Sequence, residues 1–242
     1  EAQDDLIAQI KKTPGLLEAF GIPVYSAKNF EADDVIGTIV ERTKKKEELE
    51  VVIASGDKDA LQLIEGTRVT VFTLGKGLND TVLYDEGRVV ERYGFGPAGV
   101  VDLKGIAGDP SDNIKGVPGV GEGSALKLLQ KYSSIKGIYI AIKKNGVEKV
   151  AEATGVQKRF VQLMADHKEE AEFSKLLATI RRDVPIDFEL PTKSWREGAD
   201  AKRALDMLAE FEFRALVPRV KQILSGEETG KTPPKKVTGG SK

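Results

Sequence analysis

Residues 51–59 read Val-Val-Ile-Ala-Ser-Gly-Asp-Lys-Asp, an apolar run of four residues that ends in small and acidic residues. The apolar spacing predicts one helix that starts near Glu31 and a second over Asp59–Ile64, so helices flank the run. A short apolar run between helices is typical of a strand buried on both faces of a parallel sheet. Val69–Phe72 is a second predicted strand. The alternation predicts an α/β fold with a doubly wound, mainly parallel sheet.

The strand signals stop near residue 97, where the character of the chain changes. Before this point we also expect a helix over residues 6–20, a short strand at Val24–Tyr25 and a loop over residues 75–80. Residues 97–225 have the pattern of an all-helical subdomain that ends in an amphipathic helix pair over Lys202–Leu224. Residues 226–242 are rich in Gly, Lys, Pro and Thr, as in a flexible tail or linker. The predicted domains are therefore residues 1–96 and 97–225.

The composition limits the kinds of site that the chain can build. Its 242 residues include no cysteine and one histidine, His167, which excludes disulfides, thiolate sites and a histidine-rich zinc centre. Any bound metal must be held by oxygen, which favours Mg²⁺ or Mn²⁺. No apolar run approaches the roughly 20 residues of a membrane span, and no signal peptide opens the chain. We expect a cytoplasmic protein with no membrane partner.

The formal net charge of −1 conceals an uneven distribution. Residues 1–114 carry 13 Lys and Arg against 21 Asp and Glu, whereas residues 115–225 carry 20 against 15. Charge blocks are often only solvated faces of a protein. An acidic part followed by a basic part is also the arrangement expected when a metal-binding region precedes a region that binds a polyanion.

Carboxylates gather in three short segments: a predicted helix start, the end of the predicted strand, and a turn. The seven that we assign to a metal site are Glu31, Asp33, Asp34, Asp57, Asp59, Asp109 and Asp112. Each segment alone has a structural explanation, because acids complement the helix macrodipole, cap helices and form turns. Together they are harder to explain, since two of the segments should meet at the carboxyl edge of the sheet. Two divalent ions would relieve their mutual repulsion and are suited to phosphoryl transfer.

The most specific segment is a glycine-rich hairpin at residues 114–129, which reads Ile-Lys-Gly-Val-Pro-Gly-Val-Gly-Glu-Gly-Ser-Ala-Leu-Lys-Leu-Leu. Its glycine spacing predicts a helix-hairpin-helix, in which backbone amides and a helix N-terminus bind phosphates without reading bases. The residues assigned to DNA binding are Lys115, Gly116, Gly119, Gly121, Gly123, Ser124 and Lys127. A helical corner that binds nothing is the alternative. A nucleotide P-loop is excluded, because no Gly-Lys-Ser/Thr closes this loop.

These segments together resemble the 5′–3′ exonuclease domain of bacterial DNA polymerase I, which belongs to the flap-endonuclease superfamily. The resemblance covers about residues 5–225 and rests on the hairpin and on three acidic motifs, in the family's order. The motifs are Phe30-Glu31-Ala32-Asp33-Asp34, Ser55-Gly56-Asp57-Lys58-Asp59-Ala60-Leu61-Gln62-Leu63 and Gly108-Asp109-Pro110-Ser111-Asp112-Asn113-Ile114. It implies a PIN-like nuclease domain over residues 1–96 and a helix–three-turn–helix subdomain over residues 97–225.

The resemblance implies a nuclease that hydrolyses DNA from a 5′ end or at a 5′ flap in replication and repair, including the removal of RNA primers. By position, the seven carboxylates would bind two Mg²⁺ or Mn²⁺ ions, with Asp34, Asp57 and Asp59 as catalytic residues. The hairpin would grip duplex DNA beside a nick or gap and hold a K⁺ ion. RNA–DNA hybrids are a further expected substrate. We expect a monomer of the bacterial cytoplasm and nucleoid, with a polymerase domain as one possible continuation of its tail.

The chain also departs from the family at its N-terminal side. Family members begin with a strand that ends in a metal-binding aspartate, followed by a second acidic site and a helical arch, none of which precedes Glu1. We therefore expect an N-terminally truncated piece that binds DNA but cleaves it poorly by itself. One rival interpretation is a catalytically silent module that binds DNA through the hairpin only. Another is an RNA-cleaving relative, against which the hairpin argues.

Overall fold

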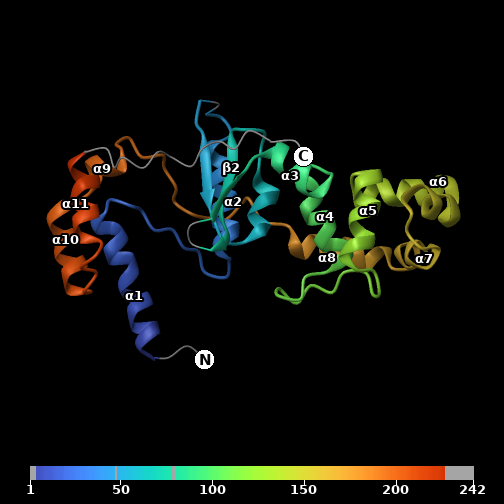
Figure 1. Cartoon of the computed structure of the whole chain (residues 1–242), viewed down its shortest axis with the longest axis horizontal. Helices are drawn as coiled ribbons and strands as arrows, with labels where there is room; N and C mark the ends of the chain where they lie inside the picture. The colour runs from blue at the N-terminus through green and yellow to red at the C-terminus, as the bar shows by residue number, and fades with distance from the viewer. Residues whose placement is uncertain (1–3, 47, 78–79, 227–242) are drawn as a thin grey trace. The chain divides into compact units, whose positions relative to one another are not determined.

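A computed structural model describes residues 4–46, 48–77 and 80–226. The chain forms two compact units, one of residues 29–184 and the other of residues 1–28 with 185–242. Figure 1 labels the helices and strands, and the two units are described separately below.

The unit of residues 29–184 contains the sheet and most of the helices. Its elements are α2 (Ala32–Thr43), β1 (Val51–Ala54), the 3₁₀ helix η1 (Lys58–Leu63), β2 (Val69–Gly77), β3 (Asp80–Tyr84), α3 (Glu86–Tyr93), α4 (Ala98–Ala107), α5 (Glu122–Tyr132), α6 (Ile135–Thr154), α7 (Lys158–Asp166) and α8 (Lys168–Ala178). Gly146 has non-helical backbone angles (φ 81°, ψ 162°) and divides α6 into two helical pieces. This order of elements confirms an α/β region followed by an all-helical region.

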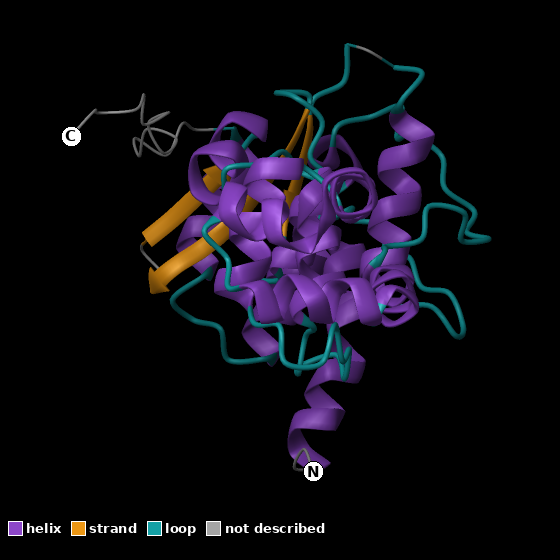
Figure 2. Ribbon diagram, turned by 90° about the vertical axis from the view of Figure 1, so that its right-hand side faces the viewer, coloured by secondary structure: helices purple, strands orange, loops and turns teal. Residues whose placement is uncertain are grey.

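The described strands form one mixed sheet of order β1-β2-β3, drawn in orange in Figure 2. β1 pairs with β2 in parallel, with Val51 beside Val69 and Ala54 beside Phe72. β2 and β3 pair in antiparallel orientation, so residues 75–77 and 80 of the predicted loop are strand, and residues 78–79 of it lie outside the described part of the chain. Glycines and turn residues are typical of loops, so the sequence of this segment predicted a loop. The segment is a strand because it pairs with an antiparallel partner.

Two apolar cores hold this unit together. One lies where α2, η1 and the sheet meet and includes Val40, Leu61, Leu63 and Val71. The other lies among the helices from α4 to α8 and includes Ile106, Leu128, Leu129, Ile138 and Met164. α4 packs against η1, α5 and α8, and therefore connects the two cores. The end of α4 is the point at which the sheet region and the helical region meet.

The second unit is helical in its described part and consists of α1 (Asp4–Ala19), α9 (Trp195–Gly198), α10 (Ala201–Glu210) and α11 (Val217–Ser225). α1 packs against α10, and α10 packs against α11, so the predicted helix pair near the C-terminal end is confirmed. The predicted strand at Val24–Tyr25 is wrong, because these residues belong to a non-repetitive segment with Val24 exposed. Among the described helices, none is both long and apolar enough to cross a lipid bilayer.

Candidate metal centre and nucleic-acid interface

The first acidic motif occupies the beginning of α2. Glu31 is the N-cap residue, and Asp33 and Asp34 lie in the first turn. Glu31 and Asp34 form a reciprocal capping box, in which the Glu31 N–H donates to Asp34 Oδ2 at 3.3 Å. Acids in a first helical turn also complement the macrodipole, so the helix itself fixes where these carboxylates stand.

The second acidic motif follows β1 directly. Asp57 caps η1, and its Oδ1 atom accepts a hydrogen bond from the Asp59 N–H at 2.9 Å. Asp59 is then turned inward, with an exposed fraction of only 9%. A carboxylate this deeply placed requires cationic or hydrogen-bonding partners, because burying a bare charge is costly.

The third acidic motif lies in a tight turn after α4. The turn is closed by two backbone hydrogen bonds of 2.8 Å between Asp109 and Ile114, one in each direction. Asp109 Oδ1 also accepts from the Ser111 N–H at 2.9 Å, which fixes its side chain. Gly108 enters the turn with φ +76°, and a Cβ there would lie 2.7 Å from the Ile114 carbonyl oxygen. Only glycine fits this position without displacement of the backbone.

Asp59, Asp109 and Asp112 converge, although they come from different parts of the chain. One carboxylate oxygen from each lies within 4.8 Å of the others, an arrangement able to hold a metal ion. The Lys104 ammonium lies among them: it forms ion pairs with Asp59 and Asp109 and is 3.4 Å from Asp112 Oδ2. Lys104 was not predicted from the sequence. The feature that could have indicated it is a lysine within the otherwise mainly apolar helix α4, where a charged side chain needs a specific partner.

The charges of this cluster act strongly on one another. Burial alone would lower the pKa of Lys104, but its hydrogen bonds to Asp109 and Asp59 outweigh burial and raise that pKa. Burial likewise works to raise the pKa of Asp109, but the Lys104 ammonium and the Ser111 hydrogen bonds hold it at about 2. For Asp59, burial prevails over Lys104, and its pKa is raised. Lys104 therefore serves as the internal counter-ion of the cluster.

The carboxylates at the start of α2 and the carboxylate of Asp57, which follows β1, also repel one another. The pKa of Asp33 is raised, first by burial and then by the negative charges of Asp57, Glu31 and Asp34. Asp57 in turn contributes to the raised pKa of Asp59. Asp57 thus acts on Asp33 at the start of α2 and on Asp59 in the cluster of Asp59, Asp109 and Asp112. The assignment of the seven carboxylates as metal ligands stays a prediction.

Asp34 has structural partners that the sequence did not predict. Its Oδ1 atom accepts a hydrogen bond from the Arg181 N–H at 2.9 Å. Gln62 binds the residues just before Arg181. Its side chain accepts a hydrogen bond from the Ile180 N–H and donates one to the Ala178 carbonyl, both at 3.1 Å. Asp34 therefore joins the metal-site region to the segment after α8.

The hairpin begins where the acidic turn ends. The Val117 N–H donates to the Ile106 carbonyl at 2.8 Å, which ties the hairpin to the end of α4. Gly116 is buried, its N–H donates to Ser174 Oγ at 3.1 Å, and a Cβ there would lie 2.2 Å from the Gly108 nitrogen. The Gly116 N–H is therefore already bonded within the protein, and Gly116 permits close packing of the two turns. Its assignment to DNA binding stays a prediction.

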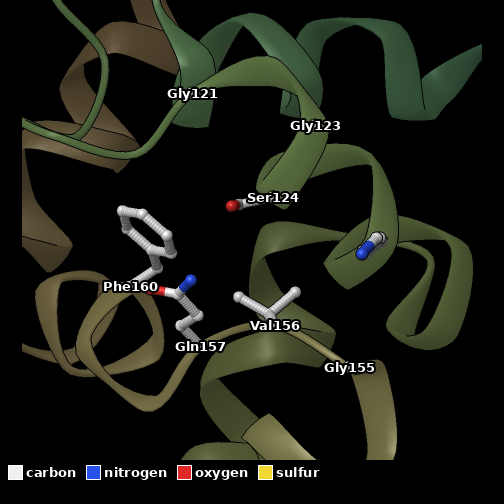
Figure 3. A pocket seen from close by; sticks show the side chains of 8 residues that line it. Gly121, Gly123, Ser124, Gly155, Val156, Gln157 and Phe160 are labelled. Atoms are coloured by element: carbon white, nitrogen blue, oxygen red, sulfur yellow. The ribbon is translucent and has the colours of Figure 1, made fainter.

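The other predicted hairpin residues face outward. Lys115, Gly119, Gly121, Gly123 and Lys127 are exposed, and Ser124 is half-buried. Four of them line a pocket of about 410 Å³ at the start of α5, whose lining is Gly121, Gly123, Ser124, Lys127, Gly155, Val156, Gln157 and Phe160 (Figure 3). The last four run from the C-cap of α6 to the first turn of α7 and were not predicted, because the sequence does not show which distant segment packs beside the hairpin.

Two family models match the chain. They are the 5′-3′ exonuclease N-terminal resolvase-like domain over residues 1–94 and the 5′-3′ exonuclease C-terminal SAM fold over residues 95–212. DNA polymerase I of Bacillus caldotenax is 38% identical over 213 residues, which make up 88% of this chain and 23% of that protein. The 5′-3′ exonuclease of Mycobacterium tuberculosis is 32% identical over 231 residues, which make up 93% of this chain and 70% of that protein. The chain thus spans about a quarter of the polymerase relatives' length.

The fold has a solved counterpart as well. A bacteriophage T5 flap endonuclease variant, solved in complex with DNA and metal ions, has a TM-score of 0.57 at 16% identity. The similarity covers 94% of this chain and 72% of that one. The predicted fold class and the family resemblance are both confirmed, and the chain belongs to the 5′–3′ exonuclease family.

Proposed function

We propose that the chain supplies the acidic metal site and the DNA-holding hairpin of a metal-dependent 5′–3′ exonuclease and 5′-flap endonuclease. The observation that carries the proposal is the convergence of Asp59, Asp109 and Asp112, whose oxygens lie within 4.8 Å of one another. The turn that bears Asp109 is joined to the hairpin through Ile114. A phosphate bound by the hairpin would therefore lie at a fixed distance from the carboxylates.

The donor set fits a hard divalent ion. Every predicted ligand is a carboxylate, and oxygen-only coordination suits Mg²⁺ or Mn²⁺ rather than zinc. We propose that Asp59, Asp109 and Asp112 hold one ion, and that Glu31, Asp33, Asp34 and Asp57 contribute to a two-ion site at the same acidic region. Such ions activate water near neutral pH and stabilise the charge of a transferring phosphoryl group.

The residues of the chain have distinct tasks in this proposal. The Lys104 ammonium neutralises the cluster in the metal-free protein and would have to leave Asp59 and Asp109 for those carboxylates to hold an ion. The exposed hairpin amides and Lys127 bind phosphates of the duplex, so binding is independent of base sequence and weakens with salt. Carbonyl groups of the hairpin are the proposed ligands of a K⁺ ion.

The substrate class follows from the relatives and the site together. The phage flap endonuclease was solved with DNA and metal ions, and we infer the same ligands here: duplex DNA with a 5′ end or flap, nicked or gapped, with RNA–DNA hybrids as a secondary substrate. The relatives that are DNA polymerases suggest a role in flap and primer removal in the bacterial cytoplasm, as a monomer linked to a polymerase domain.

Single-turnover cleavage of a labelled 5′-flap duplex, with the chain in excess over DNA, tests the proposal. The wild-type chain should cleave slowly with Mg²⁺ and stop with EDTA. Asp59→Asn should reduce the rate at least about a hundredfold while leaving DNA affinity in EDTA intact, and the exposed Asp206→Asn is the matched control. Lys127→Ala should weaken DNA binding and reduce its salt dependence.

Two outcomes separate the alternatives. Cleavage that survives EDTA, or that Asp59→Asn does not slow, would contradict the metal site. Duplex binding without metal-dependent cleavage by any variant would support the rival interpretation, a module that binds DNA through the hairpin alone.

A further inference from the structure

The pocket beside the hairpin has two walls from different parts of the helical region. One wall consists of Gly121, Gly123, Ser124 and Lys127 at the start of α5, and the other of Gly155, Val156, Gln157 and Phe160, which run from the end of α6 to the first turn of α7. Figure 3 shows the Ser124 hydroxyl, the Gln157 amide and the Phe160 ring facing the same space. Only the first wall belongs to the predicted hairpin, so the second has no assigned role.

The two walls repeat one local structure. In each, a glycine with positive φ (Gly119, 80°; Gly155, 63°) precedes a buried valine, Val120 or Val156. The next residue caps the following helix without a side-chain hydrogen bond. The first amides of a helix have no intrahelical acceptor, so both walls present unsatisfied N–H groups and partial positive charge.

The polar side chains of the pocket are without protein partners. Within residues 4–46, 48–77 and 80–226, Ser124, Lys127 and Gln157 form no side-chain hydrogen bond or ion pair. Among the residues that the structure describes, no carboxylate lines the pocket, and the exposed Glu122 lies between the lining residues Gly121 and Gly123 in sequence. Glu148, on the helix before the second wall, is neutralised by its ion pair with Lys158. The pocket therefore offers a cation, hydrogen-bonding groups and amides to an anion, with no competing negative charge in its lining.

The apolar part of the lining restricts which anion fits. Val156, which belongs to the helical core, and the half-buried Phe160 ring, which packs against that core, form one side of the pocket, and a free phosphate would gain nothing from the exposed part of the Phe160 ring. A nucleic-acid strand satisfies both parts, because its phosphate is anionic and the face of its deoxyribose is apolar. Phosphate and sugar contacts are also those that position a protein on a duplex.

We propose that this pocket seats the sugar–phosphate backbone of one strand of the bound duplex, with Gln157 and Phe160 in direct contact with it. The grip on DNA is then formed by two hairpins, the start of α7 being the second. This inference rests on the proposed function of the first hairpin and extends it to a wall that the sequence did not identify.

Equilibrium binding of the 242-residue chain to a nicked duplex, followed by fluorescence anisotropy in EDTA over about 50–300 mM KCl, tests the inference. Gln157 is uncharged, so Gln157→Ala should weaken binding about three- to tenfold at every salt concentration and leave the slope of log K against log salt unchanged. Gln157→Glu should weaken it further by repelling the phosphate. Phe160→Leu should weaken binding and keep the fold. Gln162→Ala, on the same helix but outside the pocket lining, is the matched control and should bind like the wild type.

Lys127→Ala distinguishes failure of the inference from failure of the proposed function. If Lys127→Ala weakens binding but both Gln157 variants and Phe160→Leu bind like the wild type, the second wall does not contact DNA and the inference is overturned. If Lys127→Ala has no effect either, the proposed hairpin function fails with it. Melting temperatures of all variants within a degree or two of the wild type would show that binding, not folding, is being measured.

Discussion

Lys104 is the residue on which the state of the acidic cluster depends. Its ammonium group lies where a divalent ion would neutralise Asp59, Asp109 and Asp112, so the metal-free protein satisfies these charges internally. An internal cation has two consequences, because it stabilises the metal-free fold and competes with any ion that enters. The same lysine should therefore oppose metal binding while it supports the fold.

Replacing Lys104 separates these two effects. Lys104→Met should destabilise the metal-free protein by about 1–3 kcal/mol, because it leaves the buried Asp59 and the half-buried Asp109 without their cation, a cost that partial exposure to solvent reduces. It should also tighten Mn²⁺ binding, because no ammonium has to be displaced. Thermal unfolding with and without Mn²⁺ checks both expectations, with a larger metal-induced rise in melting temperature for the variant.

The control for this substitution is Lys175→Met. Lys175 pairs with the buried Asp102 at 2.8 Å, away from the carboxylate cluster, so its loss should destabilise the protein without altering the response to Mn²⁺. Equal metal-induced shifts in the two variants would show that Lys104 does not occupy the metal position.

Asp33 gives the clearest pH-dependent behaviour in the metal-free protein. Its pKa is raised in the folded state, by burial and then by the charges of Asp57, Glu31 and Asp34, so folding favours its protonated form. This contribution is fully present below the unfolded pKa and is lost as pH rises through the higher folded pKa. Asp33→Asn should therefore melt at a higher temperature than the wild type at pH 7 in EDTA.

Melting curves at several pH values check the sign. The difference between wild type and Asp33→Asn should shrink towards pH 3, where Asp33 is protonated in both states. A difference that persists at low pH would assign the effect to packing rather than to charge.

At the scale of elements, the turn after α4 joins the metal site to the hairpin. Gly116 is buried with φ +64°, and a Cβ there would lie 2.2 Å from the Gly108 nitrogen. Gly116→Ala should destabilise the protein by about 2–4 kcal/mol, because the clash is with backbone and cannot be relieved by a side-chain rotation. Urea unfolding measures this loss.

Gly123→Ala is the matched comparison for that glycine. Gly123 has ordinary backbone angles and open space around its Cα, so an added methyl group should leave stability nearly unchanged. Similar stability of the two variants would contradict the close packing of the turns at Gly108 and Gly116.

The elements formed by local pattern were predictable from the sequence, and those set by distant contacts were not. The apolar run at Val51–Ala54 is β1, and the hairpin leads into α5, because both follow from residues adjacent in the chain. The strand predicted at Val24–Tyr25 is absent, since two apolar residues cannot show whether a partner strand is present. The Asp34–Arg181 hydrogen bond and the Gly155–Phe160 wall depend on contacts between segments far apart in sequence.

The site shows the same division. The sequence gathers the carboxylates by motif, but it does not show that Lys104 neutralises three of them. Nor does it show that Gly116 packs inward while Gly121 and Gly123 line a pocket. The residue types indicated metal and phosphate binding. Whether each of these residues faces a site or the protein interior depended on how distant segments pack.

In the molecule as a whole, the acidic region proposed to bind metal and the basic region proposed to bind DNA both lie within the unit of residues 29–184, whose two cores meet at α4. The charge asymmetry of the sequence agrees with this division, because the acidic motifs precede residue 115 and the hairpin lysines begin there. Metal binding and DNA binding should therefore be separable by mutation and coupled in the intact chain, since each phosphate held beside the ions adds a ligand.

Calorimetric titration of Mn²⁺ into the wild-type chain and into the double variant Asp59→Asn, Asp109→Asn, each with and without a nicked duplex, tests most directly whether these aspartates hold the metal. We expect saturable Mn²⁺ binding by the wild type, tighter when the duplex is present, and loss of that binding in the double variant, which still binds the duplex. Equal uptake of Mn²⁺ by the two proteins would contradict this expectation.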